Sequence, residues 1–134
     1  MVPRSLRLMF VVHFVADLLF AIPLFFFPVR FLSALGWTAV DPVATRIVAA
    51  ALFGIGIQSL LSRNASADAF RELLGLKMIW SATAAIGIAI SALQSGPPMA
   101  FAFAAVFAAF FGVWTTFRLK LGGPPGAGAE DAAT

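Results

Sequence analysis

The feature that most constrains this chain is a series of apolar runs, each about as long as a helix that crosses a bilayer. A crossing helix needs about 20 apolar residues, and the first run, residues 8–27, has that length. Only 11% of the 134 residues are charged, whereas a soluble domain carries about 25%. Such a chain cannot cover a water-facing surface, so we predict an all-α membrane protein.

Turn signals divide the apolar sequence into four spans. We expect transmembrane helices over residues 6–27, 43–61, 73–93 and 99–117, packed as one up-down bundle within residues 1–121. Asp41 and Pro42 suit the N-cap and first turn of the second span, and residues 95–98, Ser-Gly-Pro-Pro, end the third. Residues 122–134 are rich in Gly, Pro and Ala, which predicts a disordered tail.

The first span has the basic start of a signal peptide, with Arg4 and Arg7 ahead of the apolar run. However, the run is longer than the 7–15 residues of a signal-peptide core, and it ends in Phe-Phe-Phe-Pro instead of small residues. We therefore interpret it as a retained first span.

Basic residues are distributed unevenly between the two ends of the predicted bundle. One end holds seven and the other two; the seven are Arg4, Arg7, Arg63, Arg71, Lys77, Arg118 and Lys120, and the two are Arg30 and Arg46. The positive-inside rule places the richer end, with both termini, in the cytoplasm. Because this small basic excess lies at helix ends, we expect no nucleic-acid partner.

Several apolar and small residues predict how the helices are anchored and packed. Phe31, Leu32, Leu35 and Trp37 share one face of a short interfacial helix, if residues 29–37 are helical and not a plain loop. Trp37, Trp80 and Trp114 are the candidate aromatic anchors. A stripe of small residues on span four is either a homodimer face or, as we favour, a contact within the bundle; it comprises Ala100, Ala104, Ala108 and Gly112.

Asp17 lies near the middle of the first span, where a carboxylate costs roughly 2.5–3.5 kcal/mol to insert. The fourteen Leu, Ile, Val and Phe residues of this span offset that cost, but Asp17 must still be paired, protonated or hydrated. His13 is four residues earlier and shares its helix face. By depth, the candidate neighbours are Arg46, Gln58, Lys77 and Trp80. Together these groups predict a polar pocket that opens toward the cytoplasm.

Three interpretations of His13 and Asp17 remain open: a clasp that fixes helix register, a ligand pocket, and a proton-coupled site. With no Cys and one His, the chain offers neither thiol chemistry nor a His-rich metal site. Ser81 and Thr83 have no recognisable activating partner, so no catalytic residue, metal or cofactor is predicted and an enzyme is the less favoured interpretation.

The first half of the chain is similar to a known family. The resemblance rests on Phe-Phe-Phe-Pro at 25–28, Phe-Leu at 31–32, Leu-Gly-Trp at 35–37, Asp-Pro at 41–42, Arg46, Ala-Ala-Ala at 49–51 and Gly-Ile-Gly at 54–56. In these positions the chain resembles the DoxX family of small bacterial four-helix membrane proteins. The resemblance implies an up-down bundle in a bacterial inner membrane and no agreed activity.

From the residues we expect a protein that binds a lipophilic or amphipathic small molecule around His13 and Asp17, or that serves as a subunit of a membrane complex. A homo-oligomer or a membrane-protein partner fits the second case. The alternative is a small proton-linked transporter or channel in which Asp17 titrates, since intramembrane carboxylates mark proton relays.

Overall fold

The computed structural model describes residues 1–122, and all regular elements within them are helical. The four long helices are α1 (Arg4–Phe26), α3 (Pro42–Leu61), α4 (Ala67–Gln94) and α5 (Met99–Lys120); the short ones are α2 (Pro28–Ala34) and the 3₁₀ turn η1 (Ser62–Asn64). The four long helices, α3 taken together with η1, are each long and apolar enough to cross a membrane. The chain is thus an all-α, multi-pass membrane protein. The tail expected to be disordered is residues 122–134, and all of it except Gly122 lies outside the described residues.

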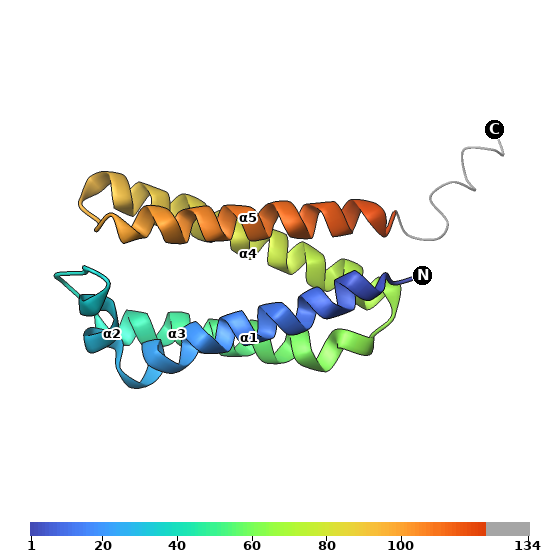
Figure 1. Ribbon diagram of the computed structural model, residues 1–134, viewed down its shortest axis with the longest axis horizontal. Helices are drawn as coiled ribbons and strands as arrows, with labels where there is room; N and C mark the ends of the chain where they lie inside the picture. The colour runs from blue at the N-terminus through green and yellow to red at the C-terminus, as the bar shows by residue number, and fades with distance from the viewer. Residues whose placement is uncertain (123–134) are drawn as a thin grey trace.

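The long helices form two layers, with α1 packed against α3 and α4 packed against α5 (Figure 1). The N-terminus and the last turn of α5 lie at one end of the molecule, which we call the terminal end. The helix α2 lies at the other end, which we call the α2 end. The two layers therefore meet each other over a smaller area than the helices within each layer do.

The ends of α3 and α4 are set by local capping. Asp41 Oδ1 accepts hydrogen bonds from the backbone N–H groups of Val43 at 2.8 Å and Ala44 at 3.2 Å, which confirms Asp41 as the predicted N-cap. Helix α4 begins at Ala67, earlier than the expected start near residue 73. The reason is a second cap, since Ser66 Oγ accepts from Ala69 N and Asp68 lies in the first turn.

Residues 28–34 do form a short helix, α2, so the loop alternative is wrong. The four apolar residues expected on one face, Phe31, Leu32, Leu35 and Trp37, are all half-buried. Gly36, in the turn after α2, has φ +100°, a conformation that favours glycine. A Cβ on Gly36 would lie 3.2 Å from Pro97 Cβ, so this turn reaches the α4–α5 connection.

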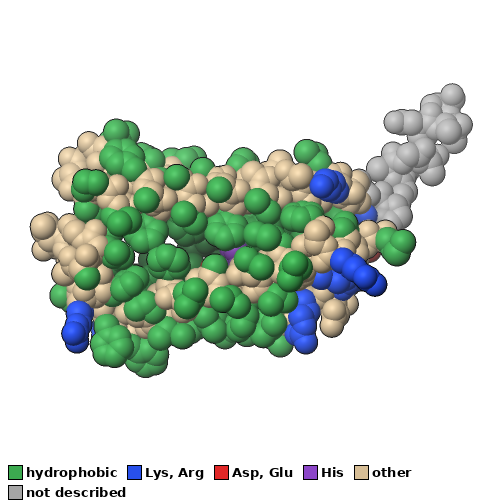
Figure 2. Space-filling model, viewed as in Figure 1, with side chains coloured by type: hydrophobic (Ala, Val, Ile, Leu, Met, Phe, Trp, Pro, Cys, Tyr) green, Lys and Arg blue, Asp and Glu red, His purple; other side chains and the backbone are tan. Residues whose placement is uncertain are grey.

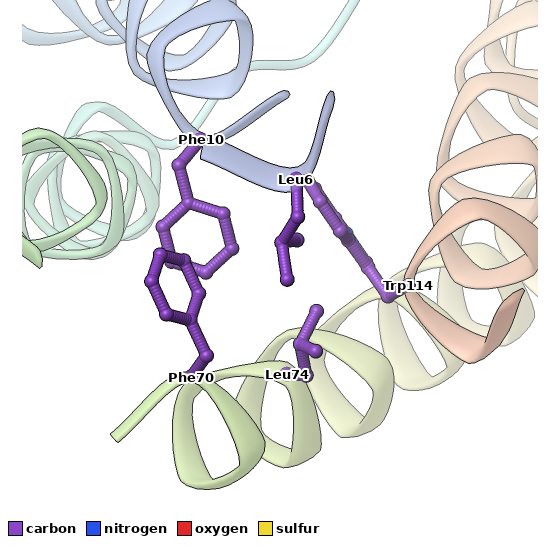
Figure 3. Close-up of a cluster of buried hydrophobic side chains, with 5 residues drawn as sticks. All are labelled: Leu6, Phe10, Phe70, Leu74 and Trp114. Carbon is purple, nitrogen blue, oxygen red and sulfur yellow. The ribbon is translucent and has the colours of Figure 1, made fainter. Parts of the chain in front are cut away.

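A cluster of fully buried side chains joins the two layers at the terminal end (Figure 3). We call it the terminal core: Leu6, Phe10, Phe70, Leu74 and Trp114. Phe10 and Phe70 pack edge to face with ring centroids 4.7 Å apart, a favoured aromatic geometry. Trp114 belongs to this core with no exposed surface, so its prediction as an interfacial anchor is wrong.

Some basic residues of the terminal end donate to free backbone carbonyl groups at helix ends. Arg7 donates to the Arg63 carbonyl at 2.8 Å, and Arg71 donates to the carbonyls of Leu121 and Gly122 at the end of α5. Figure 2 shows most of the visible blue side chains at this end. Lys77 differs because it is only 3% exposed, so it does not extend to the headgroups as a surface cation.

The small-residue stripe of α5 packs within the bundle only in its first half. Ala100 is buried and Ala104 is half-buried, whereas Ala108 and Gly112 are exposed. A Cβ on Gly112 would meet no atom within 4 Å. The favoured prediction of a contact within the bundle is therefore wrong for the second half of the stripe.

Candidate functional site

A cavity of about 590 Å³ lies between the two helix layers toward the α2 end. Ligand pockets in proteins typically measure about 300–1,000 Å³, so its size suits a small molecule. All five α-helices contribute to its wall. In Figure 2 it is visible as a hollow between the layers, with the chain's single histidine, in purple, at its inner end.

The wall of the cavity is mostly aromatic and aliphatic. Its aromatic side chains include Phe20 of α1, Trp37 after α2 and Phe103 of α5. The Phe20 and Phe103 rings are 5.5 Å apart and the Trp37 and Phe103 rings 5.9 Å, so these rings link α1, the α2 turn and α5 across the hollow. Asp17 is the only Lys, Arg, Asp or Glu residue among the described residues that line the cavity.

A polar cluster forms the inner end of the cavity, where the layers come together. His13 Nδ1 lies 2.9 Å from Asp17 Oδ2 and 3.0 Å from Lys77 Nζ. Lys77 Nζ also donates to Ser59 Oγ at 2.7 Å, and Ser59 in turn donates to the Ile55 carbonyl. The cluster thus brings one group from α3 and one from α4 to the two on α1, and all four side chains are buried.

Lys77 is held in this apolar setting by rings as well as by hydrogen bonds. Its Nζ lies 5.0 Å from the ring centroid of Phe10 and 5.0 Å from that of Trp114, both members of the terminal core. A desolvated cation over aromatic faces gains about 2 kcal/mol. The terminal core therefore both joins the layers and accommodates the lysine ammonium.

The donors and acceptors of the cluster do not balance at Asp17. His13 Nδ1 faces both Lys77 Nζ and Asp17 Oδ2. An ammonium group only donates and a carboxylate only accepts, so this one nitrogen serves either Lys77 as an acceptor or Asp17 as a donor, according to the tautomer. Asp17 Oδ2 is buried with no hydrogen bond from any other described residue, and no Lys or Arg described here forms an ion pair with it.

Gly56 allows α3 to pack closely against α1 at the level of Asp17. A Cβ at this position would lie 2.9 Å from Asp17 Cβ, closer than real Cβ atoms approach their neighbours, and 3.2 Å from Oδ2, which is a tight contact. Gly54, one half-turn away, would place its Cβ in open space. Gly56 is thus the residue that brings α3 and its Ser59 close enough to α1 to complete the cluster.

A second cavity of about 290 Å³ borders the opposite side of the cluster. Its lining includes Ser59 and Lys77 together with Gln58. Gln58 itself is exposed and donates to Ser62 Oγ at 2.8 Å. It is therefore a wall residue of this smaller cavity and makes no hydrogen bond to His13 or Asp17 among the described residues.

Two further predicted site residues, Arg46 and Trp80, also lie away from the cluster. Arg46 donates from Nε to the Phe25 carbonyl at 3.1 Å, where it neutralises the C-terminal end of α1. Trp80 packs against a separate cluster of Ala21, Leu24, Ala49 and Leu52. The prediction that His13 and Asp17 share one pocket with Arg46 and Trp80 is therefore wrong, because these residues face other neighbours.

The larger cavity also opens in a direction that the sequence did not predict. We expected a pocket on the side of the termini, but the terminal core fills that region. The cavity instead extends from His13 toward α2, between residues such as Leu32, Thr45 and Phe103. The physical reason is that large aromatic side chains close the layers at the terminal end and leave them apart at the other.

Sequence reasoning did not identify Ser59 and predicted Trp114 only as an interfacial anchor. Ser59 sits in an apolar helix and bonds its own i−4 carbonyl, a common arrangement for serine in such helices that carries no functional signal. Its role depends on the approach of Lys77 from α4. Only the three-dimensional packing of α3 and α4 shows this contact.

The fold and the site together define a class: a multi-pass all-α membrane protein with a mostly apolar cavity that ends on a buried polar cluster. No group of three or more His, Cys, Asp and Glu side chains suited to a metal ion occurs within residues 1–122. Comparisons of the chain with protein families, with curated proteins and with solved structures found no match.

Proposed function

We propose that this protein binds a lipophilic or amphipathic small molecule in the cavity between its two helix layers. The observation that carries the proposal is the combination of a 590 Å³ apolar cavity with one polar end at His13 and Asp17. Binding sites for small molecules are usually apolar, with a few polar groups that fix orientation. A ligand would thus place its tail among the phenylalanine rings and its polar head at the cluster.

The same proposal includes the position of the protein in the cell. We infer an up-down bundle in a bacterial inner membrane with both termini in the cytoplasm. Its support is the charge distribution: Arg4, Arg7, Arg63, Arg71, Arg118 and Lys120 belong to the terminal end, against Arg30 and Arg46 at the α2 end. In this orientation the cavity lies in the outer half of the bilayer, and ligand enters from the lipid between α1 and α5.

Binding of tritiated dodecanol to the purified protein in lipid nanodiscs tests this proposal. We expect binding above that of empty nanodiscs, and its loss in Ala16→Phe, which fills the cavity from its α1 wall. Ala50→Phe adds the same ring on an exposed face outside the cavity and serves as the control. Equal binding by both variants and the unmodified protein would contradict the proposal, as would no binding by any of them.

Proton-linked transport is a second candidate, which the smaller cavity favours. The groups from Asp17 through His13 and Lys77 to Ser59 connect the larger cavity with the smaller one. A carboxyl group that exchanges its proton between two cavities is the elementary requirement of such transport. Proteoliposomes with an imposed pH gradient test it: solute flux or proton flux that Asp17→Asn abolishes would support transport, and no flux in the unmodified protein would exclude it.

A further inference from the structure

We infer that the ligand of this cavity carries a protonated amine as its head group, an inference that rests on the proposed binding function. The carboxyl group at the polar end of the cavity is the starting point of this inference. Asp17 is a carboxyl group 93% removed from solvent, since only 7% of its surface is exposed. Its Oδ2 atom is buried against His13 Nδ1 at 2.9 Å and has no hydrogen bond from any other described residue, so the protein gives this carboxyl group few donors, and a poorly bonded buried polar group is costly.

The nearest protein groups supply at most one donor to the carboxylate. His13 Nδ1 lies 2.9 Å from Asp17 Oδ2 and 3.0 Å from Lys77 Nζ, so it can donate to the carboxylate or accept from the ammonium, but not both. Lys77 is turned instead toward Ser59 and the rings of the terminal core. Lys77 is not part of the cavity lining, so Asp17 is the one charged side chain that the described residues place on the cavity wall. A carboxylate in this position is the complement of a head group with both donors and positive charge.

The rest of the wall favours the same chemistry. No Lys or Arg lines the cavity among residues 1–122, so nothing there would pair with an anionic head. Phenylalanine rings surround the position of the head, including Phe20, Phe107 and Phe110, and aromatic faces attract cations. An anionic head would meet Asp17 as a like charge in a medium of low dielectric, where repulsion is strong.

The inferred ligand is therefore an amphipathic amine that enters from the bilayer with its alkyl or aromatic tail in the apolar part of the cavity. Its ammonium group would donate to the Asp17 carboxylate. Neutral alcohols would still bind through the tail and a weaker hydrogen bond, and carboxylates would bind least. This order of head groups distinguishes the inference from the general proposal that the cavity holds something lipophilic.

Three probes with one tail test the order: tritiated dodecylamine, dodecanol and dodecanoate, each measured on the protein in zwitterionic nanodiscs at neutral pH. We expect dodecylamine to bind roughly tenfold to a hundredfold more tightly than dodecanol, the range of a charge-assisted hydrogen bond. Asp17→Asn keeps the shape of the side chain but removes the charge, so it should abolish the preference while dodecanol binding persists. Persistent dodecanol binding also shows that this variant is folded.

The other possible results separate the amine inference from the proposed binding function. Equal binding of the three probes, or an amine preference that Asp17→Asn leaves unchanged, would overturn the amine inference and leave the binding function in place. No cavity-dependent binding of any probe would overturn both. Should Asp17→Asn fail to fold, Ser91→Lys on the unmodified background gives the second test, because a cation placed at the cavity wall should weaken dodecylamine and strengthen dodecanoate.

Discussion

The two ends of this bundle are built from similar residues and packed in opposite ways. At the terminal end, Phe10, Phe70 and Trp114 contact one another across the layers and are fully buried. At the α2 end, Phe20, Trp37 and Phe103 line a cavity. The difference shows that aromatic content alone does not close a helix bundle. Rings fill the space where α1, α4 and α5 converge, and they surround an open space where the layers separate.

The polar cluster lies at the boundary between these two regions. Lys77 packs against the terminal core, and Asp17 borders the cavity, with His13 between them. Such a position makes the cluster the floor of the cavity as well as the edge of the core. Substitutions in the terminal core should therefore change mainly the stability of the protein. Substitutions in the cavity wall should change mainly ligand binding.

The largest expected effect comes from one matched pair of ring deletions. Phe10→Ala removes a fully buried ring of the terminal core and should lower the free energy of unfolding in detergent by about 2–3 kcal/mol. This loss is smaller than the ~3–5 kcal/mol found in soluble cores, because the unfolded state of a membrane protein stays in an apolar solvent. Phe103→Ala removes a half-buried ring that borders an existing cavity and packs against Phe20 and Trp37, so it should cost less, about 1 kcal/mol. Denaturant unfolding of both variants measures the difference, and equal losses would contradict the contrast between the two ends.

The close approach of α1 and α3 gives the second pair. Gly56→Ala places a methyl group 2.9 Å from Asp17 Cβ and should destabilise the protein by about 1–3 kcal/mol through overpacking. Gly54→Ala meets no atom within 4 Å and should be neutral or slightly stabilising, since alanine favours a helix by roughly 1 kcal/mol over glycine. Thermal unfolding compares the two. A tolerated Gly56→Ala would mean that α3 does not pack this closely on Asp17.

A third pair tests the hydroxyl that holds Lys77. Ser59→Ala removes the acceptor at 2.7 Å from Lys77 Nζ and should cost about 1–2 kcal/mol, because a buried ammonium loses a hydrogen bond. Ser91 makes the same bond to its own i−4 carbonyl but is exposed, so Ser91→Ala should cost less than about 0.5 kcal/mol. The unfolding midpoints of both variants provide the measurement, and a neutral Ser59→Ala would remove Ser59 from the cluster.

The helices themselves could be predicted from the sequence because apolar length and local caps determine them. Asp41 with Pro42 identified the start of α3, and the four apolar runs identified the long helices. The predicted start of the third span, near residue 73, follows the apolar run, whereas the Ser66 cap and Asp68 in the first turn extend α4 beyond its apolar part. Capping is a local signal and was available in the sequence.

The site was predictable only in part, since it depends on which helices meet. His13 and Asp17 share one face of α1 by spacing alone, so their proximity followed from the sequence. Lys77 and Arg46 were equal candidates by depth, and only the packing of α4 near α1 brings Lys77 to His13 while Arg46 bonds the end of α1. The cavity itself could not be predicted, because it results from the separation of the layers and from no residue pattern.

Because the chain has no cysteine, single introduced thiols can test the central claim directly. According to this claim, an open cavity borders Asp17, whereas the neighbouring face of α1 is packed against α3. Single cysteines at Ala16, which lines the cavity, and at Ala21, which is fully buried against α3, would be treated with N-ethylmaleimide in nanodiscs. Labelling after denaturation shows that both thiols are intact. We predict that Ala16→Cys reacts and is protected by dodecylamine, while Ala21→Cys stays unlabelled. Equal labelling of the two positions, or labelling of Ala16→Cys that no ligand changes, would contradict the account.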